Sequence, residues 1–290
     1  MKLLSVAYDG RVIVGALIDD QIVNLTDILP DHPQTMPAFL SLGAAGMELA
    51  RRACRDPGST LALSRVHVLA PVPRPGKFLG VGGNFESHLR EAAHLNLPRP
   101  KHPIWFNKQT TCVIGPYDPI HRPRVSEQLD YEAELGIVIG RHCRSVKVEE
   151  ALDVVAGYVV CNDVSVRDWQ LRSPTATLGK SFDTHGPFGP WLVTPDEVGD
   201  PQSLRLRTWV NGDLRQDGST AEMIFSCAEL ISDLSQACTL EPGDVLVTGS
   251  PEGCGGLRKP PAWLKAGDVV RIEIERVGVI ENPVIDEPPR

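Results

Sequence analysis

The sequence predicts a β-rich, mixed α/β protein, and three observations point to that class. Short stretches of alternating apolar and polar residues recur along the 290 residues, which is typical of strands. The 25 prolines and 26 glycines indicate many turns between short elements. Helical patterns do not alternate regularly with the strands, which disfavours a doubly wound parallel sheet.

Residues 1–70 are expected to form a small β-rich domain. Alternation over residues 3–25 is interrupted at Asp9-Gly10 and at Asp19-Asp20, which are turn signals between strands. A helical pattern covers residues 36–56. The proline-rich connector APVPRPGK then provides a natural boundary, so residues 71–290 are predicted to form a second, larger domain.

The larger domain is expected to start with a strand that runs into a glycine turn and a short helix at residues 86–97. Residues 178–191 are rich in glycine and proline and are expected to form a loop. Further elements follow from periodicity and turn signals. The expected strands are 129–140, 157–164, 204–212, 244–249 and 268–280, and the expected helices are 148–156 and 223–238.

Composition excludes several classes of protein. A formal net charge of -8 and a pI near 5.5 argue against general binding to nucleic acid or to an anionic membrane surface. The N-terminus has no long apolar run, so neither a signal peptide nor a spanning helix is expected, and a cytoplasmic location is predicted. The seven cysteines are scattered without a Cys-x-x-Cys pair, which indicates reduced thiols.

Two glutamates one residue apart open the strand LDYEAELGIVIG. Side chains alternate along a strand, so Glu132 and Glu134 share a face and repel each other unless that face lies in water or binds a cation. Asp163 ends another apolar strand, and three carboxylates at strand ends suit Mg²⁺, Mn²⁺ or Ca²⁺. From spacing alone, a solvated strand face is an equally good interpretation.

The predicted helix at 86–97 carries a second candidate group. His88 and Glu91 are three residues apart and share a helical face. A carboxylate beside an imidazole can fix its tautomer and raise its basicity, so the pair is a candidate general base. The alternative is an ordinary charged pair on a solvated helix surface.

Charged and small polar residues in three loops complete the candidates. Arg167 offers a planar fork for a carboxylate, and Lys180 could stabilise developing negative charge as a point cation, although ordinary salt bridges explain both equally well. Thr248 and Ser250 lie in the tight loop TGSPEGCGG, whose backbone N–H groups could cradle an anion.

Together these motifs resemble the fumarylacetoacetate hydrolase family over most of residues 71–284. The resemblance rests on GVGGNFESHLRE, DYEAELGIVIG, NDVSVRDWQ, GKSFDTHGPFGPW, TGSPEGCGG and RKPPAWLKAGDVVRIEIERVGVIENPV, in that order. It implies the family's mixed β-roll with a variable small N-terminal domain, and a homodimer. It also implies that Glu132, Glu134 and Asp163 bind a divalent metal, with Mg²⁺ expected first and Mn²⁺ or Ca²⁺ as alternatives.

The same resemblance assigns further roles. His88 and Glu91 match the family's catalytic dyad, on a segment that often orders as a lid over substrate. The positions that match contacts to the substrate are Arg167, Gln170, Lys180 and Thr248. Many members have tyrosine where this chain has Phe85, so any function of that hydroxyl is missing here.

The reaction expected first is hydrolytic C–C cleavage of a 2,4-dioxo acid, an acylpyruvate-like anion, through a metal-bound enolate. His88 would activate water, and Lys180 with the metal would stabilise the enolate. Oxaloacetate decarboxylation or tautomerisation, and isomerisation of an unsaturated 2-oxo dioate, pass through the same enolate and stay open as alternatives. A metal-dependent binder without catalytic activity is the alternative from another class of protein.

Overall fold

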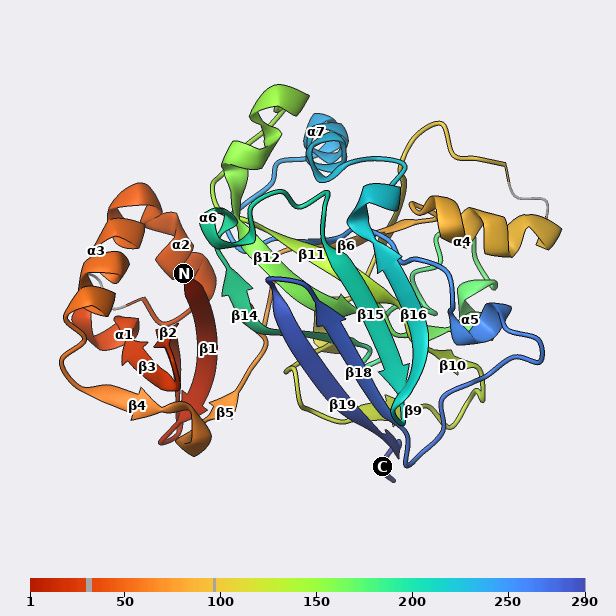
Figure 1. Ribbon diagram of the computed structural model, residues 1–290, viewed down its shortest axis with the longest axis horizontal. Helices are drawn as coiled ribbons and strands as arrows, with labels where there is room; N and C mark the ends of the chain where they lie inside the picture. The colour runs from red at the N-terminus through yellow and green to blue at the C-terminus, as the bar shows by residue number, and fades with distance from the viewer. Residues whose placement is uncertain (30–32, 96–97, 290) are drawn as a thin grey trace.

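The computed structural model describes residues 1–29, 33–95 and 98–289, and it confirms a mixed fold that is rich in sheet (Figure 1). One large sheet has the order β4 (Thr60–Ala62), β3 (Gln21–Asn24), β2 (Arg11–Ile18), β1 (Lys2–Tyr8), β14 (Gly186–Val193), β12 (Val155–Asn162), β11 (Ala133–Ile139), β17 (Val245–Val247), β6 (Phe78–Gly82) and β7 (Ile104–Asn107). Two short strands join it from the side, namely β5 (His67–Val68) on β1 and β8 (Val113–Ile114) on β14.

Two further sheets complete the β-structure of the described residues. One has the order β16 (Asp213–Ser219), β15 (Arg205–Val210), β18 (Val269–Ile274), β19 (Gly278–Asp286) and β9 (Ile120–Arg122). The other pairs β10 (Leu129–Asp130) with β13 (Ser165–Val166). Helix α7 (Cys227–Ala237) lies above the ends of the sheets in Figure 1, and Ser226 and Glu229 form a capping box at its start.

The first 70 residues contain the expected strands and turns. The chain turns between β1 and β2 at Asp9 and Gly10, and between β2 and β3 at Asp19, all with positive φ. The expected helical segment is divided at Leu42 into α2 (Met36–Ser41) and α3 (Gly43–Arg55), after the short α1 (Leu25–Ile28). Strand β1 pairs with β14, so the large sheet continues across residue 70, and the division into two domains stays a prediction.

Strand β11 is buried along its whole length. Leu135 and Ile137 pack into the core that also contains Leu206 and Ile272 of the second sheet. Val138 points to the opposite face, into the core that includes N-terminal residues. Burial on both faces explains the nearly continuous apolar run of this strand, and it fixes the register of the residues that precede it.

The expected strand 129–140 is interrupted at Tyr131 and Glu132, between β10 and β11, and three further predicted elements differ from the structure. The second half of the expected loop 178–191 is strand β14, which contains Pro187 and Pro190. Pro190 lies where the pairing of β14 with β12 is irregular, between Tyr158 and Val160, so its missing N–H group costs no regular ladder bond there. The expected strand 268–280 is a hairpin of β18 and β19. The expected helix 148–156 is a 3₁₀ helix, η4 (Val148–Val154).

Sheet topology brings distant parts of the chain to one edge. Because β11 is antiparallel to β12, the start of β11 lies beside the end of β12, with Ala133 opposite Asn162. Strand β17 is antiparallel to β11, so its end reaches the same edge, and β6 runs parallel to β17. None of the helices among the described residues is long and apolar enough to cross a bilayer.

Candidate active site

Three buried carboxylates lie at this edge of the large sheet. Glu132 precedes β11, Glu134 lies within it and Asp163 follows β12, and their side chains are only 6%, 2% and 1% exposed. Their ligand oxygens all lie within 4.8 Å of one another. This burial excludes the alternative of a solvated strand face, so the repulsion between the glutamates has to be offset by positive charge.

Two lysines supply part of that charge. The Nζ atom of Lys180 donates to Glu132 Oε2 and to Asp163 Oδ2. The Nζ atom of Lys108 donates to Asp163 Oδ1 at 2.6 Å. Both lysines are almost fully buried, so these are charge-assisted bonds shielded from water. The sequence analysis missed Lys108, because a lysine directly after an apolar strand is an ordinary strand-end residue.

Glu134 differs from its neighbour in having no cationic partner among the described residues. Gly249 N–H donates to its Oε2 at 2.6 Å. Burial, with the nearby charges of Asp163 and Glu132, raises the pKa of Glu134 well above its usual range. Burial also opposes ionisation of Glu132, but there Arg167 and Lys180 outweigh it and hold the pKa well below the usual range.

This donor set fits a hard divalent cation. All three groups are carboxylates, the oxygen ligands that Mg²⁺ and Mn²⁺ accept, and no histidine or thiolate competes among them. The unfavourable environment of Glu134 is the kind that a dication would relieve. Glu132, Glu134 and Asp163 are therefore the residues that could hold the metal.

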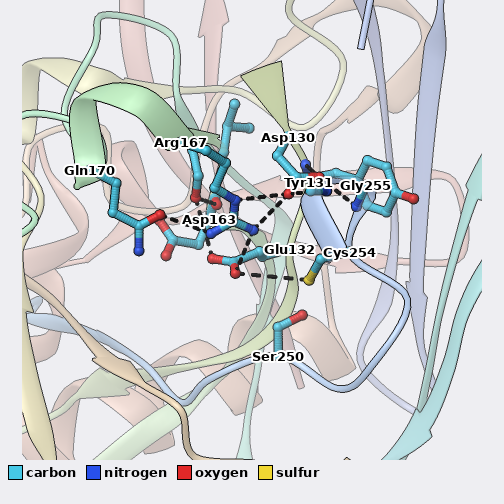
Figure 2. Close-up of polar contacts among 12 residues, drawn as sticks. Asp130, Tyr131, Glu132, Asp163, Arg167, Gln170, Ser250, Cys254 and Gly255 are labelled. Carbon is cyan, nitrogen blue, oxygen red and sulfur yellow. Dashed lines mark hydrogen bonds and ion pairs between the residues drawn. The ribbon is translucent and has the colours of Figure 1, made fainter. Parts of the chain in front are cut away.

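Arg167, at the start of α5 (Arg167–Gln170), is bonded to three side chains, as Figure 2 shows. Its Nε donates to Asp130 Oδ2 at 2.8 Å, its Nη2 to Glu132 Oε1 at 2.8 Å and its Nη1 to Gln170 Oε1 at 2.9 Å. In this structure the guanidinium is bonded to the protein's own groups, and its predicted role as a fork for a substrate carboxylate stays a prediction.

The glycine loop after β17 does cradle anions, but these are carboxylates of the protein itself. Gly253 N–H bonds Glu91 at 3.2 and 3.1 Å, and the N–H groups of Gly255 and Gly256 bond the two oxygens of Asp130 at 2.7 and 2.9 Å. With the bond from Gly249 to Glu134, the loop serves three carboxylates. Asp130 was missed from sequence because its partners lie 37 and 125 residues further along the chain.

Thr248 and Ser250 take different positions in the same loop. The hydroxyl of Thr248 donates to Leu135 O at 3.0 Å and is fully buried in the sheet. Ser250 lines the cavity described below and accepts a bond from Gln216 at 2.9 Å. The structure therefore places Thr248 behind the cavity wall, while its role in substrate contact stays a prediction.

Helix α4 (Glu86–Glu91) carries the predicted dyad, but no hydrogen bond joins its two side chains among the described residues. His88 lines the cavity, its Nδ1 is buried without a partner among the described residues, and burial lowers its pKa. The carboxylate of Glu91 is bonded to Gly253 instead. Phe85, just before the helix, is fully buried in the core and does not line the cavity.

One cavity of about 150 Å³ collects most of these side chains. It is smaller than the roughly 300–1,000 Å³ of sites for drug-sized ligands, so a small molecule fits it best. One wall is apolar and comes from β7. The polar lining residues are His88, Glu132, Glu134, Arg167, Gln170, Thr175, Lys180 and Ser250, and the apolar ones include Ile104, Trp105 and Phe106.

Residues 77–285 match the family model described as fumarylacetoacetate (FAA) hydrolase C-terminal. A mitochondrial oxaloacetate tautomerase, fahd2 of Xenopus laevis, is 45% identical over 276 residues, which cover 94% of this chain and 86% of that protein. Two solved structures extend the likeness to other reactions.

A maleylpyruvate hydrolase from Sphingobium sp. SYK-6, in complex with manganese(II) ion and pyruvate, superposes with a TM-score of 0.81 at 30% identity over 99% of this chain and 100% of that one. A 5-carboxymethyl-2-hydroxymuconate delta-isomerase from Mycobacterium smegmatis gives 0.79 at 32% identity, with the same coverage of both chains. Proteins named as a tautomerase, a hydrolase and an isomerase thus resemble this chain over most of its length, so the fold alone does not determine the reaction. The manganese(II) ion in the hydrolase structure is consistent with a divalent metal at the three carboxylates.

Proposed function

The chain belongs to the fumarylacetoacetate hydrolase family, and on that premise we propose that it catalyses keto–enol tautomerisation of a small dianionic 2-oxo acid of the oxaloacetate type. The similarity to the Xenopus tautomerase, 45% over 94% of the chain, supports this reaction over hydrolysis. The order of the two alternatives from the sequence analysis is therefore reversed.

The observation that carries the proposal is that His88 and Lys180 line the same small cavity and that the buried Nδ1 atom of His88 has no partner among the described residues. Burial lowers the pKa of His88, so its imidazole is neutral near pH 7 and can accept a proton. Tautomerisation takes a proton from C3 and places one on the C2 oxygen, and it needs no activated water. His88 would take the proton from C3 and then give that same proton to the C2 oxygen of the enolate, and the reverse reaction would move it back to C3.

Lys180 would stabilise the enolate rather than transfer its proton. Burial alone would lower the pKa of Lys180, but Asp163 and Glu132 outweigh it and raise that pKa above the usual value. The ammonium group therefore stays charged and acts as a point cation near the developing oxyanion. A Mg²⁺ or Mn²⁺ ion held by Glu132, Glu134 and Asp163 would supply Lewis-acid polarisation of the 2-oxo group.

The test follows the ultraviolet absorbance of the enol form of oxaloacetate with purified protein and Mg²⁺, while CO₂ and pyruvate are assayed in parallel. Accelerated interconversion of enol and keto forms without either product is expected, and EDTA should abolish the acceleration. Stoichiometric CO₂ would assign a decarboxylase instead, and unchanged rates of interconversion would contradict the proposal.

Hydrolysis of a 2,4-dioxo acid is the second candidate, favoured by the hydrolase structure that holds manganese and pyruvate. In that reaction His88 would activate water for attack on the 4-carbonyl. Glu91 is bonded to Gly253 and does not orient His88, which is why this candidate ranks second. Release of pyruvate and a second acid from members of a panel of acylpyruvates would favour hydrolysis over tautomerisation.

Three other expectations also stay open. A homodimer is proposed from the family resemblance, and sedimentation would test it. A cytoplasmic location stays a prediction. A binder without activity would bind oxalate, an enolate mimic, in the presence of Mg²⁺ and yet turn over none of these substrates.

A further inference from the structure

The starting point is the orientation of the Gln170 side chain in the cavity. Arginine has donors only, so the amide atom of Gln170 that lies 2.9 Å from Arg167 Nη1 has to be the oxygen Oε1. The amide nitrogen must then point elsewhere, and no partner for it is found among the described residues. Because Gln170 lines the cavity, its N–H₂ group is left to donate to a bound ligand.

Arg167 can hold that amide only if its own guanidinium is held. Figure 2 shows it between Gln170 and Asp130, with Glu132 as its third partner. The bonds to Asp130 and Gln170 use different nitrogens of one rigid plane, so the position of Asp130 sets the direction of the Nη1–H bond. Asp130 is 0% exposed and does not line the cavity.

Asp130 is in turn fixed from behind by the glycine loop. A Cβ atom at Gly255 would lie 2.7 Å from Asp130 Oδ1, and one at Gly256 would lie 3.1 Å from Oδ2. Both positions therefore need glycine so that their N–H groups can approach the carboxylate, and each N–H donates to one of its oxygens. With Tyr131 N–H and Arg167 also donating, the carboxylate has a single orientation.

We propose that Asp130 is a positioning residue: it acts through Arg167 to fix the amide of Gln170, whose position the family resemblance already assigns to substrate contact. The ligand at that end of the cavity is therefore an oxygen acceptor, a carboxylate or an oxo group, and not an ammonium group. The inference rests on the proposed function only in taking a small oxo acid as the ligand.

A double-mutant cycle on ligand binding tests this relay. Oxalate is titrated by calorimetry into protein saturated with Mg²⁺, for the wild type, Asp130→Asn, Gln170→Met and the double variant, and a separate Mg²⁺ titration verifies saturation. Each single change should weaken oxalate binding roughly tenfold or more, which corresponds to one hydrogen bond to a charged group. The double variant should bind nearly as Gln170→Met does, because the amide is the group through which Asp130 is proposed to act on the ligand.

Two outcomes would overturn the inference. One is a double variant whose fold-loss of oxalate affinity equals the product of the fold-losses of the two single variants. Independent effects of this kind are expected if Asp130 has a merely structural role. The other is wild-type oxalate binding by Asp130→Asn. If Asp130→Asn does not fold, Arg167→Lys replaces it in the same cycle, because an ammonium group cannot bond Asp130 and Gln170 in one plane.

The readout separates this inference from the proposed function. Oxalate binding needs no turnover. If the effects of the Asp130 and Gln170 substitutions on oxalate binding are coupled, but the protein does not accelerate the enol–keto interconversion of oxaloacetate, the tautomerase proposal is rejected and the positioning role of Asp130 is kept. Turnover with an uncoupled cycle would reject the relay and retain the tautomerase.

Discussion

The three carboxylates at the strand edge, Glu132, Glu134 and Asp163, are bonded to other groups of the protein, whereas helix α4 presents a histidine that is largely unbonded. At the strand edge both oxygens of Asp163 are bonded to lysines, and Glu132 is bonded to Arg167 and Lys180. On α4, His88 has a buried nitrogen without a partner among the described residues. The carboxylates and their cationic partners are therefore held in place by the fold. The imidazole of His88, which is proposed to move a proton, is not tied up in such bonds.

The difference follows from how each element is fixed. Strands β11 and β12 pair residue by residue and are buried on both faces, which leaves their end residues little freedom. Helix α4 has six residues and is held mainly at its ends, by Asn84 before it and by Glu91 at its last position. Substitutions at the strand edge should therefore change mainly the free energy of unfolding, and substitutions on α4 should change mainly the rate of turnover.

The largest effect is expected for Asp163→Ala. It removes the carboxylate that pairs with the buried Lys108 and Lys180, and uncompensated buried charge costs about 3–5 kcal/mol of the free energy of unfolding. Urea denaturation of the metal-free protein measures this. The matched control is Asp217→Ala, which breaks a pair with Arg205 at the surface and should change stability little. Equal losses for both variants would contradict the account of the cluster.

His88→Gln should show the reverse pattern. Turnover of oxaloacetate should fall by about 10²–10⁴, the usual contribution of a general base. Stability to urea should stay near that of the wild type, because no side chain among the described residues bonds the Nδ1 atom of His88. A variant that keeps its activity would remove His88 from the mechanism.

Two neutral histidines should report on pH in different ways. Burial lowers the pKa of His88, so the acid limb of the kcat/KM profile should lie below the ordinary histidine value of about 6.5. Burial lowers the pKa of His185 to about 3, although its bond to His121 O opposes this. The unfolded chain then binds one more proton between about pH 6.5 and 3, so stability falls with falling pH by up to ~1.4 kcal/mol per pH unit.

His185→Gln separates these contributions. It should reduce the slope of unfolding free energy against pH in that window and leave the acid limb of kcat/KM in place, since His185 does not line the cavity. An unchanged slope would show that His185 does not titrate as its burial implies.

The smallest effect is expected for Phe85→Tyr. Phe85 is fully buried in the core, so an added hydroxyl would cost ~1 kcal/mol if it finds no partner. Its side chain does not line the cavity, so kcat and KM should stay at wild-type values. A marked gain in kcat would show instead that the hydroxyl reaches the substrate.

The sequence predicted the cluster of three carboxylates because its signals are local. Alternation placed Glu132 and Glu134 on one face, and Asp163 stood where an apolar run ends; the structure brings the three together. Most strands were predicted for the same reason. Strand β14 was not, because its prolines are typical of loops; the irregular pairing with β12 accommodates Pro190.

Contacts between distant residues could not be predicted in this way. Asp130 and Lys108 are ordinary strand-end residues until the fold brings Arg167 and Asp163 to them. The spacing of His88 and Glu91 predicted a shared face, but it could not show that Gly253, 162 residues further on, takes the carboxylate. These bonds depend on tertiary packing.

Strand β14 lies between β12 and β1, as the order of the large sheet shows (Figure 1). A protein cut at residue 70 would present unpaired backbone N–H and C=O groups near Leu192 and Val193, a template on which another chain could add as a strand. The N-terminal segment thus also covers this sheet edge, one strand away from β12, which ends just before Asp163.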